Sequence, residues 1–468
     1  MSRPPAASET RAAPRRELTL FDCVSIIVGI IIGASIYRTG SNVAQQAPTV
    51  TWLIGLWLLG AGLSLLGALC YAELATAYPR EGGDYVYLTR AFGPWLGFLF
   101  AWCQLWIVRP GSIGMMAFAF AEYANQIWPQ ASGKHASLVL VAYAAAAVLL
   151  LTLVNMLGVR QSKWTQNVLT VAKVLGLSAI VVVGFCHTTN PSIAAAAGPD
   201  VGPTTINLSG FGLAMVFVLL AYGGWNEMAF VAAEVKNPIK NIRRALLIGT
   251  ASVAVIYVVV NLAFVHALGL TGARSPTVAA DVLRLALGPA ASIALSLLIC
   301  ISALGAINGE IFTGSRIYYA MGTDHRLYSW LGRWNARRGA PLASLLIQGV
   351  ITLSLVVGFG LTQKGFESMV LFTTPGFWCF LMLVAVSVFI LRRRDPTIER
   401  PVRVPLYPLT PIIFCMSSGF MVYTSIDYAL RNRSWEAFWA IGILAVGVLL
   451  VVIQSLRGAL RPPRTTAS

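Results

Sequence analysis

Twelve long apolar segments decide what this chain can fold into. A helix needs about 20 mostly apolar residues to cross the hydrocarbon layer of a membrane. A chain that is 57% hydrophobic and 11% charged cannot hide so much apolar surface in a water-soluble core. We therefore predict an all-α integral membrane protein with 12 transmembrane helices in the lipid bilayer. The predicted spans are 20–46, 50–78, 92–122, 136–158, 165–188, 208–234, 244–268, 288–320, 342–360, 367–391, 407–429 and 435–457.

The basic residues lie mainly on one side of these segments. If the N-terminus is inside, the first tail and the even-numbered connections hold most of the 34 Lys and Arg residues. Because positive residues collect in cytoplasmic loops, we predict a multi-pass protein of the plasma or inner membrane with both termini in the cytoplasm. The same bias explains the net charge of +16, so no nucleic-acid partner is expected.

Two of the predicted spans contain glycine near the middle of the membrane. The first reads "SIIVGIIIGASIYRTG" and includes Gly33, whereas the sixth reads "VLLAYGGWNEMAF" and includes Gly223 and Gly224. One such glycine alone would favour close helix packing. Breaks at matching positions of two halves are instead typical of inverted-repeat transporters. Unwound amides suit a carboxylate and unwound carbonyls suit an ammonium group, so the pattern indicates an amino acid as substrate.

This interpretation divides the chain into five parts. We expect a disordered cytoplasmic tail at 1–19, without the apolar core of a signal peptide. Two inverted five-helix repeats follow at 20–188 and 208–391, then helices 11 and 12 at 407–457 and a cytoplasmic tail at 458–468.

Catalytic and metal-binding motifs are missing from the sequence. It contains no HExxH, GxSxG or GxxxxGK[ST] motif, and its seven cysteines lack the paired spacing of a metal site or a disulfide framework. We therefore expect no enzyme activity, no cofactor and no metal. A non-transporting receptor is the alternative from another class, and it is disfavoured because both tails are too short for a signalling domain.

Five segments, taken in order, carry a family resemblance. They are "CYAELATAYPREGGDYVYLTRAFGP" from Cys70, "IVRPGSIGMMAFAFAEY" from Ile107, "NVLTVAKVLGL" from Asn167, "FVLLAYGGWNEMAFVAAEVKNPIKNIRRAL" from Phe217 and "GAINGEIFTGSRIYYAMGTDHRL" from Gly305. On these segments the chain resembles the L-type amino acid transporter branch of the amino acid–polyamine–organocation superfamily, of prokaryotic type. The resemblance runs from about residue 18 to 430. It implies a LeuT-like fold with broken helices 1 and 6, and sodium-independent exchange of neutral L-amino acids.

The resemblance also implies where the substrate binds. The Gly-Ser-Gly of the family's first helix is replaced here by Gly33, Ala34 and Ser35, whose amides would still hold the carboxylate. Asn226 would stabilise the second break through side-chain hydrogen bonds, and Leu220 stands where the branch often has an aromatic gate. The implied substrate-binding residues are Ile31, Gly33, Ala34, Ser35, Ile107, Val108, Leu220, Ala221, Gly223, Asn226 and Trp378.

Lys173 lies inside the fifth predicted span. It is about 12 Å along the helix from Thr165, at 1.5 Å per residue, which is deep for a lysine that reaches the headgroups. The resemblance implies that its ammonium group bonds to the carbonyls around Gly29 and Ile30, where sodium-coupled relatives bind an ion. A proton-linked role and a lysine that extends to the interface are the alternatives.

Three further charged residues have alternative interpretations. Arg109 either contacts substrate or bonds to carbonyls freed by Pro110, a gating or structural role. Glu234 either pairs with basic loop residues in an inner gate or is solvated. Arg38 either lines the outer vestibule or pairs with an acid such as Glu310.

Other transport functions stay open at this point. A proton-coupled symporter or a uniporter differs from an exchanger only in kinetics. A carrier of cationic amino acids or polyamines needs a negative charge near the substrate, for which Glu227 is the candidate. Animal members of the branch join a heavy subunit through a cysteine between spans 3 and 4. Because the loop 125–134 has no cysteine, no covalently linked heavy subunit is expected.

Overall fold

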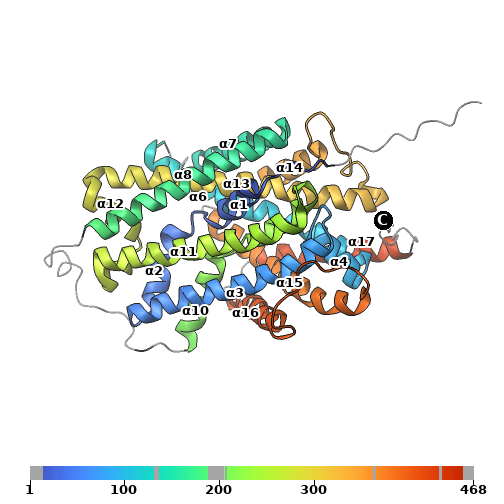
Figure 1. The fold of residues 1–468 in the computed structure, drawn as a ribbon. Helices are drawn as coiled ribbons and strands as arrows, with labels where there is room; N and C mark the ends of the chain where they lie inside the picture. The colour runs from blue at the N-terminus through green and yellow to red at the C-terminus, as the bar shows by residue number, and fades with distance from the viewer. Residues whose placement is uncertain are drawn as a thin grey trace, which may run out of the picture.

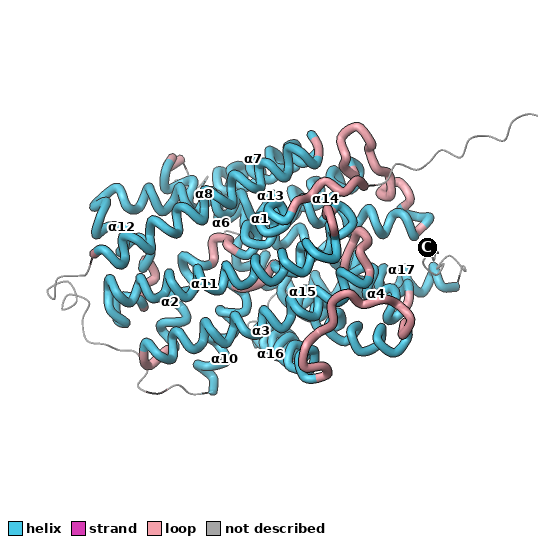
Figure 2. Tube along the Cα trace, viewed as in Figure 1, coloured by secondary structure: helices cyan, strands magenta, loops and turns pink. Residues whose placement is uncertain are grey.

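The fold is a bundle of long helices that run roughly side by side, as Figure 1 shows for a computed structural model of the chain. Among the described residues, strand-like pairing is limited to two isolated bridges, Leu18 with Val235 and Asn335 with Ala340. Most of the chain in Figure 2 is therefore coloured as helix. The structure describes residues 14–130, 136–187, 205, 208–361, 365–431 and 435–456.

Ten of the predicted spans are confirmed. In the described ranges, ten helical stretches are long and apolar enough to cross a membrane, and they coincide with every predicted span except the first and the third. Their main helices are α3 (Val50–Ala77), α7 (Ala136–Leu157), α8 (Val159–Cys186), α10 (Leu208–Ala221), α11 (Pro238–Ala273), α12 (Val278–Leu287), α13 (Ala291–Asp324), α14 (Leu342–Gly360), α15 (Gly365–Arg394), α16 (Leu409–Arg431) and α17 (Trp435–Leu456).

The other two predicted spans are built from shorter pieces. The first consists of α1 (Leu20–Ile31) and α2 (Ile36–Gln46), and the third of α5 (Pro94–Cys103), η1 (Gln104–Val108) and α6 (Arg109–Ile127). The connection before α5 folds into α4 (Asp84–Phe92). Because neither stretch is among the ten that are long and apolar enough to cross a membrane, the count of twelve spans stays a prediction.

Both predicted helix breaks are present. Helix α1 begins at a capping box, in which Thr19 and Asp22 bond reciprocally, and it ends at Ile31. Helix α10 ends at Ala221, and the chain continues through a turn into η3 (Trp225–Glu234). Gly33 and Ser35 lie at the first break, and Gly223 and Gly224 lie at the second. Glycine lowers the free-energy cost of leaving helical geometry, and the surrounding helices satisfy the freed backbone groups.

The residues before α1 pack against the end of η3. The carbonyl oxygen of Glu234 accepts bonds from the amides of Glu17 (2.8 Å) and Leu18 (2.9 Å), and the Lys236 amide donates to the Leu18 carbonyl (2.9 Å). Leu18 is fully buried. The expectation of a disordered tail therefore fails for the last residues before α1, because backbone pairing and burial order them, whereas residues 1–13 lie outside the described part.

Candidate functional site

The residues at the first helix break are mostly buried. Ile31, Gly33 and Ala34 are buried and Ser35 is partly exposed. The Gly33 amide donates to the Ile31 carbonyl (2.8 Å). A Cβ on Gly33 would lie 3.2 Å from Met116 Sδ of α6, so a larger residue there would require the Met116 side chain to shift by a few tenths of an ångström.

The second break lies directly against the first. Gly224 has φ +114°, a conformation that favours glycine, and a Cβ there would lie 2.8 Å from Ile30 Cγ2. The hydroxyl of Tyr257, on α11, lies 3.0 Å from the Ile31 carbonyl oxygen and 3.2 Å from that of Ala221. One buried hydroxyl thus connects the last carbonyls of α1 and α10. In the sequence, Tyr257 is only a polar group within an apolar span, so sequence reasoning did not single it out.

Three of the predicted substrate residues line one crevice. Gly223, Asn226 and Trp378 border a cavity of about 10 Å³, which is room for roughly one water molecule. This conformation is therefore closed at the crevice. Leu220 is 36% exposed, and its carbonyl accepts a bond from the Gly223 amide, while the Ala221 carbonyl faces Tyr257.

The expected hydrogen bonds of Asn226 at the second break are not made by its side-chain oxygen. That oxygen is buried and has no hydrogen-bond partner, so Asn226 does not stabilise the break through this atom, and its role stays a prediction. The indole nitrogen of Trp378 is likewise buried without a partner. Unpartnered polar atoms inside a protein are costly, and both residues border the crevice.

Lys173 connects α8 to the first break. It is fully buried, and its Nζ lies 2.7 Å from the Gly29 carbonyl oxygen, 2.8 Å from that of Ile32 and 3.0 Å from that of Ser302 on α13. An ammonium group has three donors, and here each has an acceptor. The Gly29 contact is as expected, whereas Ile32 and Ser302 take the place of Ile30 because the chain turns away from helical geometry after Ile31.

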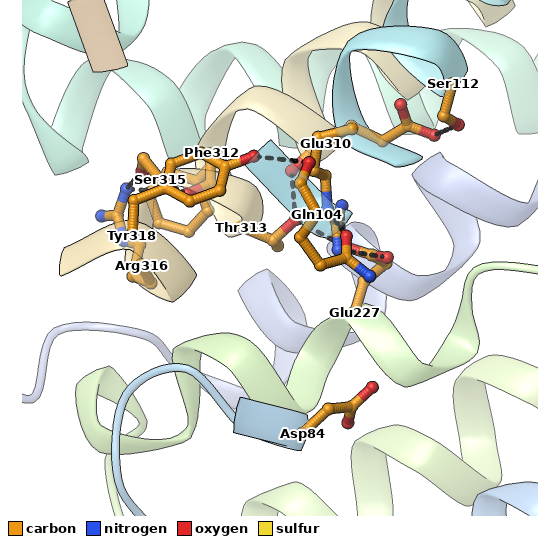
Figure 3. Close-up of polar contacts among 12 residues, drawn as sticks. Asp84, Gln104, Ser112, Glu227, Glu310, Phe312, Thr313, Ser315, Arg316 and Tyr318 are labelled. Carbon is orange, nitrogen blue, oxygen red and sulfur yellow. Dashed lines mark hydrogen bonds and ion pairs between the residues drawn. The ribbon is translucent and has the colours of Figure 1, made fainter. Parts of the chain in front are cut away.

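Arg109 forms a buried ion pair with Glu227. The two side chains are only 4% and 6% exposed, and the bond is bidentate, with Nη1 to Oε2 at 2.6 Å and Nη2 to Oε1 at 2.8 Å. Thr313 Oγ1 donates to Glu227 Oε2 (2.6 Å), and Arg109 Nε donates to Gln104 Oε1 (3.0 Å). Figure 3 shows Gln104 and Thr313 close to Glu227.

This pair corrects two expectations. Arg109 donates to the side chains of Gln104, Glu227 and Thr313, and no bond to a carbonyl freed by Pro110 is present in the described part. Glu227 is not a free negative charge for a cationic substrate, because its carboxylate already bonds to a guanidinium group. The sequence could not indicate this pairing, since the two residues are 118 positions apart.

The backbone before Arg109 is also unusual. Ile107 and Val108 lie in η1, a five-residue π-helical turn, and both are buried. Such turns often occur at functional sites because they shift the register of the side chains that follow. A Cβ on Gly376 of α15 would lie 3.6 Å from Val108 Cγ2. Val108 therefore faces α15, the helix that carries Trp378.

Glu234 pairs with Arg316 rather than with a loop residue. Both side chains are 1% exposed, with Arg316 Nε 2.8 Å from Glu234 Oε1. Arg316 lies on α13 and also donates to the Phe312 carbonyl (2.8 Å). The expectation of a basic loop partner or a solvated carboxylate is wrong because η3 ends against α13. Arg316 falls inside the predicted span 288–320, so the same rule that selected Lys173 could have found it.

Glu310 and Arg38 are the remaining two charged residues for which the sequence predicted a role. Glu310 accepts a bond from Ser112 Oγ (2.7 Å). The side chain of Arg38 lies outside the described part, so its expected partners stay predictions. Within the described ranges, no group of three or more His, Cys, Asp or Glu residues could hold a metal ion.

Comparisons with known proteins give one consistent result. A family model described as "Amino acid permease" matches residues 18–450. The b(0,+)-type amino acid transporter 1 of Mus musculus is 29% identical over 93% of this chain and 87% of its own length. The Asc-type amino acid transporter 1 of Mus musculus is 31% identical, over 90% of this chain and 78% of its own. The Large neutral amino acids transporter small subunit 2 of Homo sapiens is 30% identical, over 88% and 76%.

Proposed function

The chain belongs to the amino acid permease family and is a multi-pass membrane transporter of amino acids rather than an enzyme, and we propose that it exchanges neutral L-amino acids across the plasma membrane without sodium. The observation that carries this proposal is the position of Lys173. Its ammonium group contacts three carbonyl oxygens from α1, the first break and α13. Clustered carbonyl oxygens are typical ligands of a hard cation. A fixed cation in their midst removes the need for sodium.

The Arg109–Glu227 pair supports a neutral substrate. A cationic side chain would need an uncompensated carboxylate, but Glu227 is bonded to both terminal nitrogens of Arg109. An anionic side chain would face the same neutralised pair. Because a buried charge without a partner is costly, this surrounding favours a side chain without charge.

The substrate would bind at the two breaks. We place its carboxylate at the amides of Gly33, Ala34 and Ser35 and its ammonium group at the carbonyls of the second break. The 10 Å³ crevice is too small for an amino acid, so binding requires the elements around it to separate. Alternating access, with spans 1, 2, 6 and 7 moving against the others, supplies such a separation.

The same proposal covers the features of topology. It includes twelve spans, a 5+5 inverted repeat in which residues 20–188 and 208–391 form the two halves, and both termini in the cytoplasm. One relative is named a small subunit. We propose that this chain needs no covalently attached partner, because the loop 125–134 has no cysteine.

Exchange can be measured with purified protein in liposomes. The liposomes are preloaded with an unlabelled neutral amino acid, and uptake of a labelled neutral panel is followed without sodium. Wild type should take up label only when an internal amino acid is present. Lys173→Ala should lose most of this uptake, because the carbonyls around the first break lose their cation.

Lys240→Ala is the matched control. Lys240 lies exposed at the start of α11, so its loss should leave uptake unchanged. Uptake that requires sodium in wild type would refute the sodium-independent mechanism. Equal uptake into empty liposomes would refute exchange in favour of a uniporter, and uptake of only cationic amino acids would refute the neutral substrate class.

A further inference from the structure

A second buried carboxyl lies beside the ion pair and has no cation bonded to it. Glu310, on α13, is 8% exposed, and its Oε1 accepts one hydrogen bond from the Ser112 hydroxyl (2.7 Å). Its Oε2 is buried and has no hydrogen-bond partner. In Figure 3 the Glu310 side chain turns toward Ser112 and away from Glu227. Neither the exchange mechanism nor the substrate site uses this group.

The charges around Glu310 are already bonded to other groups. Arg109 on α6 and Glu227 on η3 both act on it electrostatically, but they bond to each other. Lys173 on α8 bonds to three carbonyls, and Asp22 on α1 bonds to Thr19 and Asn167. Among the other helices that pack on α13, neither α7 nor α14 contains Asp, Glu, Lys, Arg or His. The charged groups of α12 and α4 bond elsewhere: Arg284 to Asp281, Asp84 to Tyr71, and Arg90 to Asp395.

This environment cannot hold Glu310 as a bare carboxylate at low cost. Burying an ionised carboxylate without a cation is costly, and the group avoids this cost by taking up a proton. A protonated carboxyl keeps one acceptor oxygen for the Ser112 hydroxyl. Glu227 differs because its guanidinium partner compensates the negative charge.

We propose that Glu310 is a proton-binding site and that its proton controls how firmly Arg109 holds Glu227. Arg109 and Glu310 lie on α6 and α13, in spans 3 and 8. Glu227 lies on η3, in span 6, which belongs to the moving group in the proposed mechanism. When Glu310 is protonated, Arg109 interacts with the carboxylate of Glu227 alone, and the ion pair that joins the two groups of helices is strong. When Glu310 is ionised, its carboxylate also attracts the Arg109 guanidinium, and the Arg109–Glu227 pair weakens.

The consequence is a transport rate that depends on pH. This part of the inference rests on the proposed exchange function, whereas the proton site does not. Loss of one proton from Glu310 should speed exchange as the pH rises, by at most about tenfold per pH unit. Glu310→Gln keeps the size of the protonated side chain but cannot lose a proton. Its exchange rate should therefore stay near the slow, acidic rate of wild type at every pH.

Infrared spectroscopy tests the proton site without transport. Purified wild type should show the carbonyl stretch of a protonated carboxyl in an acid-minus-alkaline difference spectrum, and E310Q should lose it. Asp84, a buried carboxyl whose Oδ2 accepts from the Tyr71 hydroxyl (2.8 Å), is a separate group whose band, if present, E310Q leaves in place. Asp84→Asn is the matched control, because it removes the other buried carboxyl and should retain the Glu310 band.

The outcomes separate the two ideas. An unchanged difference spectrum in E310Q, or the same pH profile of exchange in wild type and E310Q, would overturn the inference. If wild type transports no amino acid, the proposed function fails, while the infrared result still decides the proton site. Should E310Q fail to fold, Ser112→Ala replaces it. Loss of the hydroxyl donor should shift the frequency of the Glu310 band, and an unshifted band would contradict the assignment.

Discussion

At the scale of single residues, buried cations are the most informative positions in this chain. Arg109 and Arg316 each bond to a carboxylate, and Lys173 bonds to three carbonyl oxygens. A charge inside a membrane protein persists only when partners compensate the loss of water. Each of these residues joins elements that are distant in sequence, so each charge also sets how two helices lie against each other.

The Arg109–Glu227 pair gives a prediction for stability. Glu227→Gln should destabilise the protein by about 3–5 kcal/mol, because it leaves the Arg109 guanidinium buried without an anion. The double variant Arg109→Gln with Glu227→Gln should be closer to wild type, since neither charge then remains. Thermal unfolding in detergent, followed by intrinsic tryptophan fluorescence, measures both. A double variant that is less stable than the single one would show that the pair contributes more than compensation.

At the scale of elements, the breaks are held by packing and not only by glycine. Gly224 touches Ile30, and Tyr257 bonds to the carbonyls at the end of α1 and of α10. The aromatic rings of Trp57 and Tyr222 pack against Tyr257, with centroids 5.4 and 5.1 Å away. The two broken helices therefore form one unit, which favours their joint movement.

Gly224 is the position where this unit can be tested. Gly224→Ala should cost about 1–2 kcal/mol of stability, because φ is +114° and the new Cβ would lie 2.8 Å from Ile30 Cγ2. It should also lower exchange in liposomes. Gly62→Ala is the control, because Gly62 lies in α3 and a Cβ there meets no atom within 4 Å. Equal effects of the two substitutions would mean that the conformation at the break is not critical.

At the scale of the whole molecule, the crevice at the second break is narrow in this conformation. The crevice beside Trp378 holds about 10 Å³. The Glu234–Arg316 pair and the bridge from Leu18 to Val235 lie at one end of η3. By the proposed orientation this end faces the cytoplasm. The ion pair joins η3 to α13, so in the proposed mechanism it would loosen when the inner side opens.

The orientation can be tested with a native cysteine. Cys186, at the end of α8, is exposed, whereas Cys23, Cys70, Cys103 and Cys300 are buried. If both termini are cytoplasmic, α8 ends outside the cell, and a membrane-impermeant maleimide should label intact cells. Cys186→Ser should remove that labelling. Labelling that appears only in inside-out vesicles would contradict the proposed orientation.

Local features of the sequence were enough for much of the fold. Apolar length predicted ten spans that the structure contains, because the requirement to cross a membrane acts on each segment separately. Glycine composition predicted both breaks, because weak helix propensity is also a local property. The family follows from the order of five segments and is supported by a match over residues 18–450.

Partner choice was decided only by the tertiary structure. From the sequence we expected Glu227 to be a free charge for a cationic substrate and Glu234 to pair with a loop residue or be solvated. Each instead pairs with an arginine from a distant helix. Asn226 was expected to bond at the break, but its oxygen has no partner. The physical reason is that a side chain's partner depends on which helix faces meet and in which register, and no single segment contains that information. The sequence determined where this chain crosses the membrane and where its helices break, whereas packing determined which buried charges compensate one another and left Glu310 without a cation.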